Sequence, residues 1–222
     1  VTAEYCPTGR YTTAMAPIFG TNKELLFGGM QSYPNYACDT WIFNGDNYTW
    51  TELFPKHQPG ARSCHAMSEV IGQNRILLFG GKHGEQINDT WFFDYNNQDW
   101  YLANTSINPP KRDLPMISPL DNDTILLFGG VEISNENDYG DTWLYNITEG
   151  KWNLKYPSAY FNPPRRHWGG MGAYYAEHAV VLFGGVQGDN QVTVLGDTWI
   201  YGASLYNGSG EYVSAPYDTG GS

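Results

Sequence analysis

Four copies of one short pattern, in the same order and at a nearly constant spacing, constrain the fold of this chain more than any other feature. Each copy has Pro-x-x-Arg, then an apolar run that ends in Phe-Gly-Gly, then Asp-Thr-Trp, and finally a second aromatic residue. The arginines, spaced by 52, 50 and 54 residues, are Arg10, Arg62, Arg112 and Arg166. The Asp-Thr-Trp units begin at Asp39, Asp89, Asp141 and Asp197. Repetition at this period indicates stacked units, each of which buries its apolar face against a neighbour.

The apolar runs inside each repeat have the length and the punctuation of β-strands. In the second repeat, strands are predicted at residues 63–71, 75–79, 90–95 and 100–104, with Gly, Asn and Asp in the turns between them. The runs show no 3.6-residue period, which argues against helices. Each repeat is therefore predicted to form one four-stranded antiparallel sheet.

These motifs together resemble the kelch repeat, and the resemblance covers nearly the whole chain. It implies an all-β fold, a kelch-type β-propeller of galactose oxidase/kelch-like architecture with four four-stranded antiparallel blades. In a single domain of residues 1–222, the blades are expected at about 10–54, 62–105, 112–157 and 166–216. Because propellers have about four to eight blades, two arrangements stay open: a four-blade ring or an arc of a larger propeller.

Charge excludes several classes of partner. The chain has a net charge of −11, from 23 acidic and 12 basic residues. That field repels a phosphate backbone and an anionic membrane surface, so no nucleic acid is expected. No apolar stretch approaches the roughly 18 residues of a membrane helix, so no membrane insertion is expected. No leader pattern stands at Val1, and any signal peptide is expected to have been removed.

Acceptor sequons for N-glycosylation point to the compartment. They occur at Asn47, Asn88, Asn104, Asn122, Asn146 and Asn207. Four of them, all but Asn88 and Asn104, are predicted in turns on one face of the propeller, where a bulky glycan is tolerated. The alternative is that Asn and Thr are merely common in turns. We expect a secreted or extracellular-surface glycoprotein whose opposite face is open to partners.

Three cysteines, Cys6, Cys38 and Cys64, permit one disulfide and one further thiol. Cys38 and Cys64 are both expected on the open face near the boundary of blades 1 and 2, so they are the candidate pair. The fate of Cys6 stays open, and a bond to another chain is one outcome.

Two sets of residues are candidates for binding on the open face. The four repeat arginines are expected at the mouth of the channel, where guanidinium groups bind planar carboxylates as a fork. Kelch domains that bind acidic peptides use arginines near this mouth, so the resemblance supports this role. The alternative is that each arginine pairs with the repeat aspartate and serves as a strut. The second set lies in the loops after Gly-Gly, which vary between repeats, and consists of Tyr33, Tyr36 and Tyr139.

Enzyme chemistry finds little support in the sequence. The histidines show no paired metal-ligand spacing, and no nucleophile elbow or phosphate loop is present, so no catalytic residue, metal or cofactor is expected. Galactose oxidase needs a crosslinked Tyr-Cys pair and two histidine ligands, a set not reproduced here. We therefore predict a non-catalytic module for protein interaction or self-assembly, with a protein or other copies of itself as partner. The alternatives are a lectin-like carbohydrate-binding module and a fragment of a copper-radical oxidase.

Overall fold

Each repeat folds into one four-stranded antiparallel sheet, with its strands in sequence order from the inside outward. The computed structural model describes residues 5–132, 137–156, 162–188, 192–202 and 211–214. Blade 1 consists of β1 (Ala14–Pro17), β2 (Lys23–Phe27), β5 (Thr40–Asn44) and β6 (Thr49–Leu53). Blade 2 consists of β7 (Ala66–Glu69), β8 (Arg75–Phe79), β11 (Thr90–Asp94) and β12 (Asp99–Leu102).

The second half of the chain repeats this plan. Blade 3 consists of β13 (Met116–Pro119), β14 (Thr124–Phe128), β17 (Thr142–Asn146) and β18 (Lys151–Lys155). Blade 4 consists of β19 (Gly170–Tyr174), β20 (Ala179–Phe183), β23 (Thr198–Gly202) and β24 (Glu211–Ser214), with a 3-10 turn at Tyr175–Glu177. The described strands of each blade lie within the range that the sequence predicts for it.

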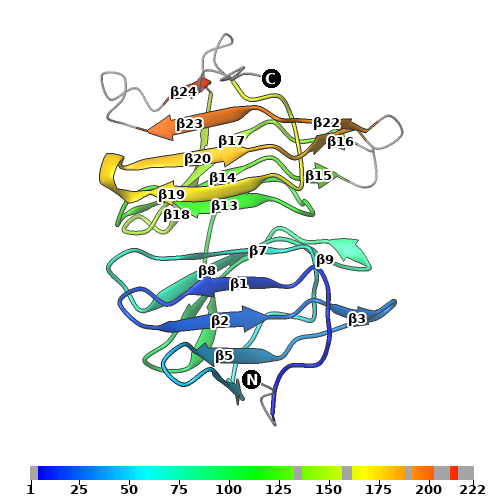
Figure 1. The fold of residues 1–222 in the computed structure, drawn as a ribbon, viewed down its shortest axis with the longest axis vertical. Helices are drawn as coiled ribbons and strands as arrows, with labels where there is room; N and C mark the ends of the chain where they lie inside the picture. The colour runs from blue at the N-terminus through cyan, green and yellow to red at the C-terminus, as the bar shows by residue number, and fades with distance from the viewer. Residues whose placement is uncertain (1–4, 133–136, 157–161, 189–191, 203–210, 215–222) are drawn as a thin grey trace, which may run out of the picture.

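The second and third strands of every blade are joined by a small hairpin, where the sequence predicted an irregular loop. The hairpins are β3 (Met30–Ser32) with β4 (Asn35–Tyr36), β9 (Lys82–His83) with β10 (Glu85–Gln86), β15 (Val131–Glu132) with β16 (Asn137–Asp138), and β21 (Val186–Gln187) with β22 (Thr193–Val194). All of them project from the same end of the blades (Figure 1). We call this end the hairpin face, and the opposite end the turn face.

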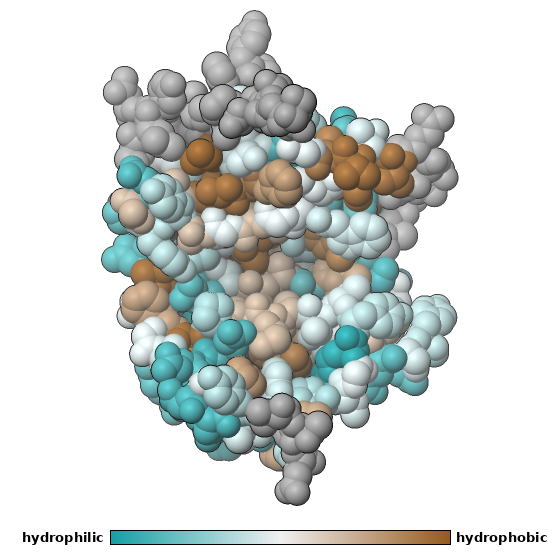
Figure 2. Space-filling model, viewed as in Figure 1, coloured by the Kyte–Doolittle hydropathy of each residue, from teal (hydrophilic) through white to brown (hydrophobic). Residues whose placement is uncertain are grey.

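The four sheets are arranged around a common axis, as the blades of a β-propeller. In Figure 1, blades 3 and 4 lie above blades 1 and 2. The inner strands pack in order, β1 on β7, β7 on β13, and β13 on β19. Between the described strands β19 and β1 there is no contact of comparable extent. Figure 2 shows a recess with apolar surface between the two halves of the molecule. The junction of blades 4 and 1 therefore differs from the other three.

A separate hydrophobic core fills each of the three packed junctions. Alternate residues of a strand face opposite neighbours, because side chains in a strand alternate with period two. On β8, Leu77 and Phe79 lie in the core shared with blade 3, while Ile76 and Leu78 lie in the core shared with blade 1. Blades 3 and 4 share a third core. Blades 2 and 3 are thus apolar on both faces of the sheet.

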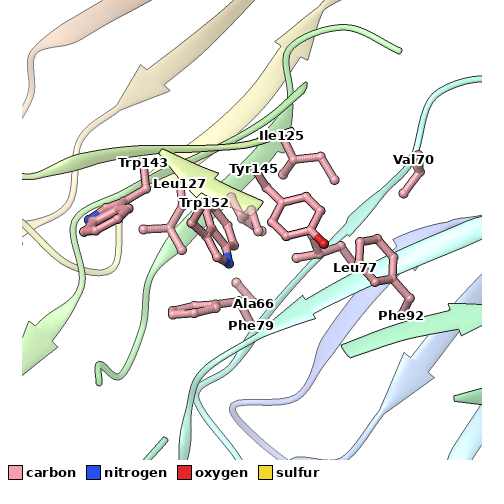
Figure 3. Close-up of a cluster of buried hydrophobic side chains, with 11 residues drawn as sticks. Ala66, Val70, Leu77, Phe79, Phe92, Ile125, Leu127, Trp143, Tyr145 and Trp152 are labelled. Atoms are coloured by element: carbon pink, nitrogen blue, oxygen red, sulfur yellow. The ribbon is translucent and has the colours of Figure 1, made fainter. Parts of the chain in front are cut away.

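The second aromatic residue of a repeat fills the junction with the preceding blade, between blades 1 and 2 and between blades 2 and 3. Trp100 and Trp152 are 1% and 2% exposed. Their indole Nε1 atoms donate across the junction to Thr40 Oγ1 at 3.0 Å and to Thr90 Oγ1 at 2.9 Å. Figure 3 shows Trp152 from blade 3 directed at the residues of blade 2. The Trp of Asp-Thr-Trp also packs between blades: Trp143 is 7% exposed in the core of blades 2 and 3, and Trp91 packs, partly buried, against the core of blades 1 and 2.

The Gly-Gly pair allows two blades to approach closely. Gly28 has φ +62°, and a Cβ atom there would lie 2.7 Å from the carbonyl oxygen of Arg62 in the next blade. The second glycine of each of the first three pairs also donates its amide N–H to the carbonyl oxygen of the next repeat arginine, as Gly81 does to Arg112 at 3.1 Å. Only glycine meets both the positive φ and the lack of space. The described residues contain no helix long and apolar enough to cross a membrane.

Candidate interaction face

The hairpin face is built on the connectors that carry the repeat arginines. The residue after each arginine pairs with the first residue of a hairpin. These pairs are Tyr11 with Met30, Ser63 with Lys82, Asp113 with Val131, and His167 with Val186. Each hairpin therefore has a fixed position over the inner end of its blade.

The repeat arginines are struts and not a ligand clamp, which corrects the binding role predicted for Arg10, Arg62, Arg112 and Arg166. Each guanidinium forms a two-point ion pair with the aspartate of its own blade, as Arg166 does with Asp197 at 2.6 and 2.8 Å. The same group donates to the carbonyl oxygen of the first glycine of the pair, Gly184 in blade 4, at 2.9 Å. The arginine side chains are only 0–4% exposed. A carboxylate ligand could reach these guanidinium groups only by displacing the strand ends that they hold.

The repeat aspartate has a second partner within its own motif. Asp197 Oδ2 accepts a hydrogen bond from Trp199 Nε1 at 2.6 Å, and each of the other three repeats has the equivalent bond. The hydrogen bond from Arg166 lowers the pKa of Asp197. The spacing of Asp-Thr-Trp thus places a carboxylate between a guanidinium and an indole.

Polar bonds tie neighbouring hairpins together at blades 2 and 3. Lys82 Nζ lies 3.0 Å from a carboxylate oxygen of Asp113, whose side chain is 1% exposed. Burial raises the pKa of Asp113, and the Lys82 ammonium group opposes that shift. Gln86 Nε2 also donates to the carbonyl oxygen of Val131 at 2.7 Å. These contacts join the hairpin of blade 2 to the connector and hairpin of blade 3.

A buried His-Asp pair makes the corresponding link between blades 3 and 4. His167 Nδ1 lies 2.6 Å from Asp138 Oδ1, and the two side chains are 7% and 1% exposed. Asp138 Oδ2 accepts the amide N–H of Gly188 at 2.6 Å. Both side chains are buried and bonded within the protein, so we assign them the role of holding the hairpin face in place.

The three predicted contact tyrosines have different positions. Tyr33 is 81% exposed at the tip of the first hairpin. Tyr36 packs against His83 of the second hairpin, with ring centroids 4.9 Å apart and the ring planes tilted by 55°. The ring of Tyr139 packs against the Arg112 guanidinium, whose central carbon lies 4.0 Å from the ring centroid. Much of this ring therefore contacts the blade itself. Tyr33, Tyr36 and His83 are thus the aromatic residues that the first two hairpins present on this face, and together we call them the tyrosine patch.

Further aromatic residues on this face were missed by sequence reasoning. Tyr11 is 53% exposed and Trp168 is 65% exposed. Trp168 has φ +57°, and the same position of the other repeats also has a positive φ, at Thr12, Cys64 and Leu114. Amides at this position bond from blade to blade around the channel, for example Cys64 N–H to the Thr12 carbonyl at 2.9 Å. In the sequence, Trp168 and its equivalents lie two residues after a repeat arginine, and this constant offset could have identified the position.

The predicted disulfide between Cys38 and Cys64 is wrong, since all three cysteines, Cys6 included, are free thiols. Cys38 packs at the edge of the core between blades 1 and 2. Cys64 instead lies in the connector at the channel mouth, with its Sγ 3.7 Å from Ser63 Oγ. Burial raises the pKa of the Cys64 thiol, which makes it a poor nucleophile.

The sequons divide into two groups, according to whether the asparagine is exposed or donates a side-chain hydrogen bond within the protein. Asn47, Asn104 and Asn122 are exposed. Asn88 donates to the Pro109 carbonyl at 3.3 Å, and Asn146 ends a strand and donates to Asp123 at 2.9 Å. Asn146 was predicted in the turn itself, and Asn207 lies outside the described residues.

The titratable side chains that the structure describes include a buried histidine, His65, and several acidic residues. Burial lowers the pKa of His65 to about 3, so the ring is neutral at physiological pH. Among the described residues, no three His, Cys, Asp or Glu side chains come together as the ligands of a metal would. What the hairpin face offers chemically is an ordered surface with exposed aromatic rings.

The family model that describes the KLHDC2/KLHL20/DRC7 Kelch-repeats domain matches residues 12–205 of this chain. Curated relatives include Kelch domain-containing protein 1 of Mus musculus, 27% identical over 169 residues, which are 73% of this chain and 38% of that protein. The Dynein alpha chain, flagellar outer arm, of Chlamydomonas reinhardtii is 31% identical over 115 residues, 51% of this chain and 2% of that protein.

A third relative is the tRNA wybutosine-synthesizing protein 4 of Saccharomyces cerevisiae, 28% identical over 100 residues, 44% of this chain and 13% of that protein. The matched regions thus span well under half the length of each of these relatives.

Proposed function

The chain belongs to the kelch-repeat family, and from this premise we propose that it is a non-catalytic module that binds a protein partner through its hairpin face. Kelch-repeat domains are generally protein-interaction modules, although some relatives of this chain take part in wybutosine synthesis. The observation that carries the proposal is the tyrosine patch: exposed aromatic rings on hairpins that buried polar bonds hold in place.

Energetics favour such a surface for binding. Tyr and Trp are enriched among the residues that dominate interface energies, because they bury a large area at a low cost in side-chain entropy. The frame beneath the patch is already ordered, so little additional ordering is needed on association. The net charge of −11 favours a partner with a basic surface around its contact site.

Tyr33→Ala is expected to weaken partner binding strongly, whereas Tyr48→Ala is expected to preserve it. The control is matched, because Tyr33 and Tyr48 are 81% and 62% exposed, on the hairpin face and the turn face respectively. Truncation of an interface tyrosine costs about 2 kcal/mol or more, a loss of about 30-fold in affinity. The measurement is quantitative affinity capture from the native source with the wild-type chain and both variants. A capture profile that Tyr33→Ala leaves unchanged would remove the hairpin face as the binding surface.

We also propose that the protein is secreted or displayed at the cell surface. Support comes from the sequons with exposed asparagines, of which Asn47 is the best placed. Its Oδ1 accepts a hydrogen bond from Thr49 Oγ1 of the same sequon at 2.7 Å, in the turn between β5 and β6. Glycans there and at Asn122 would leave the hairpin face uncovered.

Glycopeptide analysis of native material is expected to find glycan at Asn47, Asn104 and Asn122. The tied sites, Asn88 and Asn146, are expected to be empty, because a glycan would replace one of the two amide hydrogens and add a bulky group where the amide is held against Pro109 or Asp123. A native protein without any glycan would overturn the extracellular assignment. Full occupancy of Asn146 would show that its bond to Asp123 forms only in the unmodified chain.

A further inference from the structure

A polar recess lies at the turn face of blade 2. Its volume of about 610 Å³ falls within the roughly 300–1,000 Å³ of typical ligand pockets. Residues 72–75, in the turn between β7 and β8 and at the start of β8, line it together with Asp94, Asn96 and Tyr101. Because the turns of the blade lie at the end opposite the hairpins, the recess is separate from the tyrosine patch (Figure 1).

Arg75 supplies the positive charge of this recess. Its guanidinium group donates to the hydroxyl oxygen of Tyr101 at 2.7 Å and to the side-chain oxygen of Gln73, and both acceptors are neutral. Among the described residues Arg75 forms no ion pair, whereas each repeat arginine holds an aspartate. A guanidinium group has five N–H bonds, so these two hydrogen bonds leave both donors and an uncompensated charge for a ligand.

The carboxylate opposite Arg75 in the sheet bonds elsewhere. Asp94 on β11 pairs with Arg75 on β8 in the strand register, but its side chain bonds within its own turn. Asp94 Oδ1 accepts the backbone N–H of Asn96 at 2.9 Å, and Oδ2 accepts the side-chain amide of Asn97 at 2.8 Å. The guanidinium of Arg75 is therefore available to a planar carboxylate from outside, the group that a guanidinium binds as a fork.

The neutral groups of the recess suit a ligand with several hydroxyl groups. The side chains of Asn74 and Asn96 share one bond, from Asn74 Nδ2 to Asn96 Oδ1 at 3.2 Å. Each amide can both donate and accept, as a hydroxyl group can. The ring of Tyr101 is 39% exposed and lies against the buried ring of Phe92, with the ring planes 16° apart. The sheet thus holds a flat aromatic ring beside two amides and a guanidinium group.

The frame of the repeat does not require these side chains, because the other blades have different residues in the same places. At the position of Arg75, the strand registers of blades 1, 3 and 4 place Lys23, Thr124 and Ala179. At the position of Tyr101, they place Thr51, Asn153 and Val213. Residues that vary inside a repeated frame can serve binding without disturbing the core.

We propose that the recess on blade 2 binds an acidic monosaccharide, a sugar unit that carries a carboxylate, such as a uronic acid. Arg75 pairs with the carboxylate, the amides of Asn74 and Asn96 bond the hydroxyl groups, and the ring of Tyr101 covers one face of the sugar. Phosphate or sulfate fits less well, because Asp94 and the net charge of −11 oppose a doubly charged anion. This site goes beyond the proposed partner binding and does not depend on it.

Titration of the isotope-labelled full chain, followed by NMR of its backbone amides, tests this site. Glucuronate is expected to shift the signals of residues 72–75 and 96. Glucose lacks the carboxylate and acetate lacks the hydroxyl groups, so each is expected to bind at least about 10-fold more weakly. A glucuronate titration that moves no signal in the recess, or equally tight binding of glucose, would overturn the proposal. Tighter binding of sulfate than of glucuronate would overturn the assignment to a sugar.

Two variants with the same change in net charge sharpen the test. Arg75→Gln removes the guanidinium of the recess and is expected to weaken glucuronate binding by about 10-fold or more. Arg165→Gln removes an exposed guanidinium from the connector to blade 4 and is expected to bind like the wild type. Arg75→Lys keeps the charge without the fork, so an intermediate affinity is expected, and this variant decides the question if Arg75→Gln does not fold. Wild-type affinity in both Arg75 variants, with thermal unfolding as the check on folding, would show that Arg75 does not bind the ligand.

Discussion

Arg166→Ala is expected to lower the free energy of unfolding by about 3–5 kcal/mol, the loss typical when one partner of a buried ion pair is removed. The Arg166 side chain is 0% exposed and holds both oxygens of Asp197 and the Gly184 carbonyl. Truncation leaves a partly buried carboxylate and an unpaired carbonyl, and it opens a cavity between a connector and a strand end. The predicted loss therefore combines electrostatics with packing.

The neighbouring residue provides the control for this variant. Arg165 is exposed, so Arg165→Ala is expected to change the free energy of unfolding by less than about 0.5 kcal/mol. Urea denaturation of the wild-type chain and both variants measures the two differences under the same conditions. Similar small changes in both variants would mean that the repeat arginine is dispensable, and that the strut assignment is wrong.

Acid should reduce the difference between Arg166→Ala and the wild type. The pKa of Asp197 in the folded chain lies below its ordinary value of 3.8, because of the hydrogen bond from Arg166. Its contribution is thus fully present above that value and is lost as the pH falls through the lowered pKa. The variant lacks the contribution at every pH, so the two stability curves approach each other below about pH 4, and the difference due to packing and to the Gly184 carbonyl remains.

The sheets could be predicted from the sequence because their signals are local. Strand β8 was predicted at residues 75–79 and is found at Arg75–Phe79, bounded by turn residues on one side and Gly-Gly on the other. Strand β7 was predicted from residue 63 but begins at Ala66. Ser63 pairs instead with Lys82 of the hairpin. That pairing joins residues far apart in the sequence, which no local pattern reports.

The candidate site was less predictable, because its geometry depends on where side chains point. The sequence placed the arginines at the channel mouth and left two roles open, and only the direction of each guanidinium toward its own aspartate decides between them. The hairpins have strands of two or three residues, too short to show a period of two. Cys38 and Cys64 were paired by neighbourhood alone, and the structure separates them between a core edge and a connector.

Trp152→Ala is expected to destabilise the chain by about 3–5 kcal/mol, as large-to-small changes at a buried aromatic residue do. The side chain is 2% exposed and lies in the core between blades 2 and 3, against Phe79 and Tyr145 (Figure 3). Its removal opens a cavity and also leaves Thr90, which is 1% exposed, without the donor that its hydroxyl accepts from.

Two further substitutions separate these contributions. Trp152→Phe keeps an aromatic ring in the junction and loses the 2.9 Å bond to Thr90 Oγ1, so a smaller loss of about 1–3 kcal/mol is expected. Trp168→Ala removes an indole that is 65% exposed and is expected to cost less than about 0.5 kcal/mol. Thermal and urea unfolding of the three variants rank their losses of stability. If Trp152→Ala proved as mild as Trp168→Ala, the second aromatic residue would not hold the blades together.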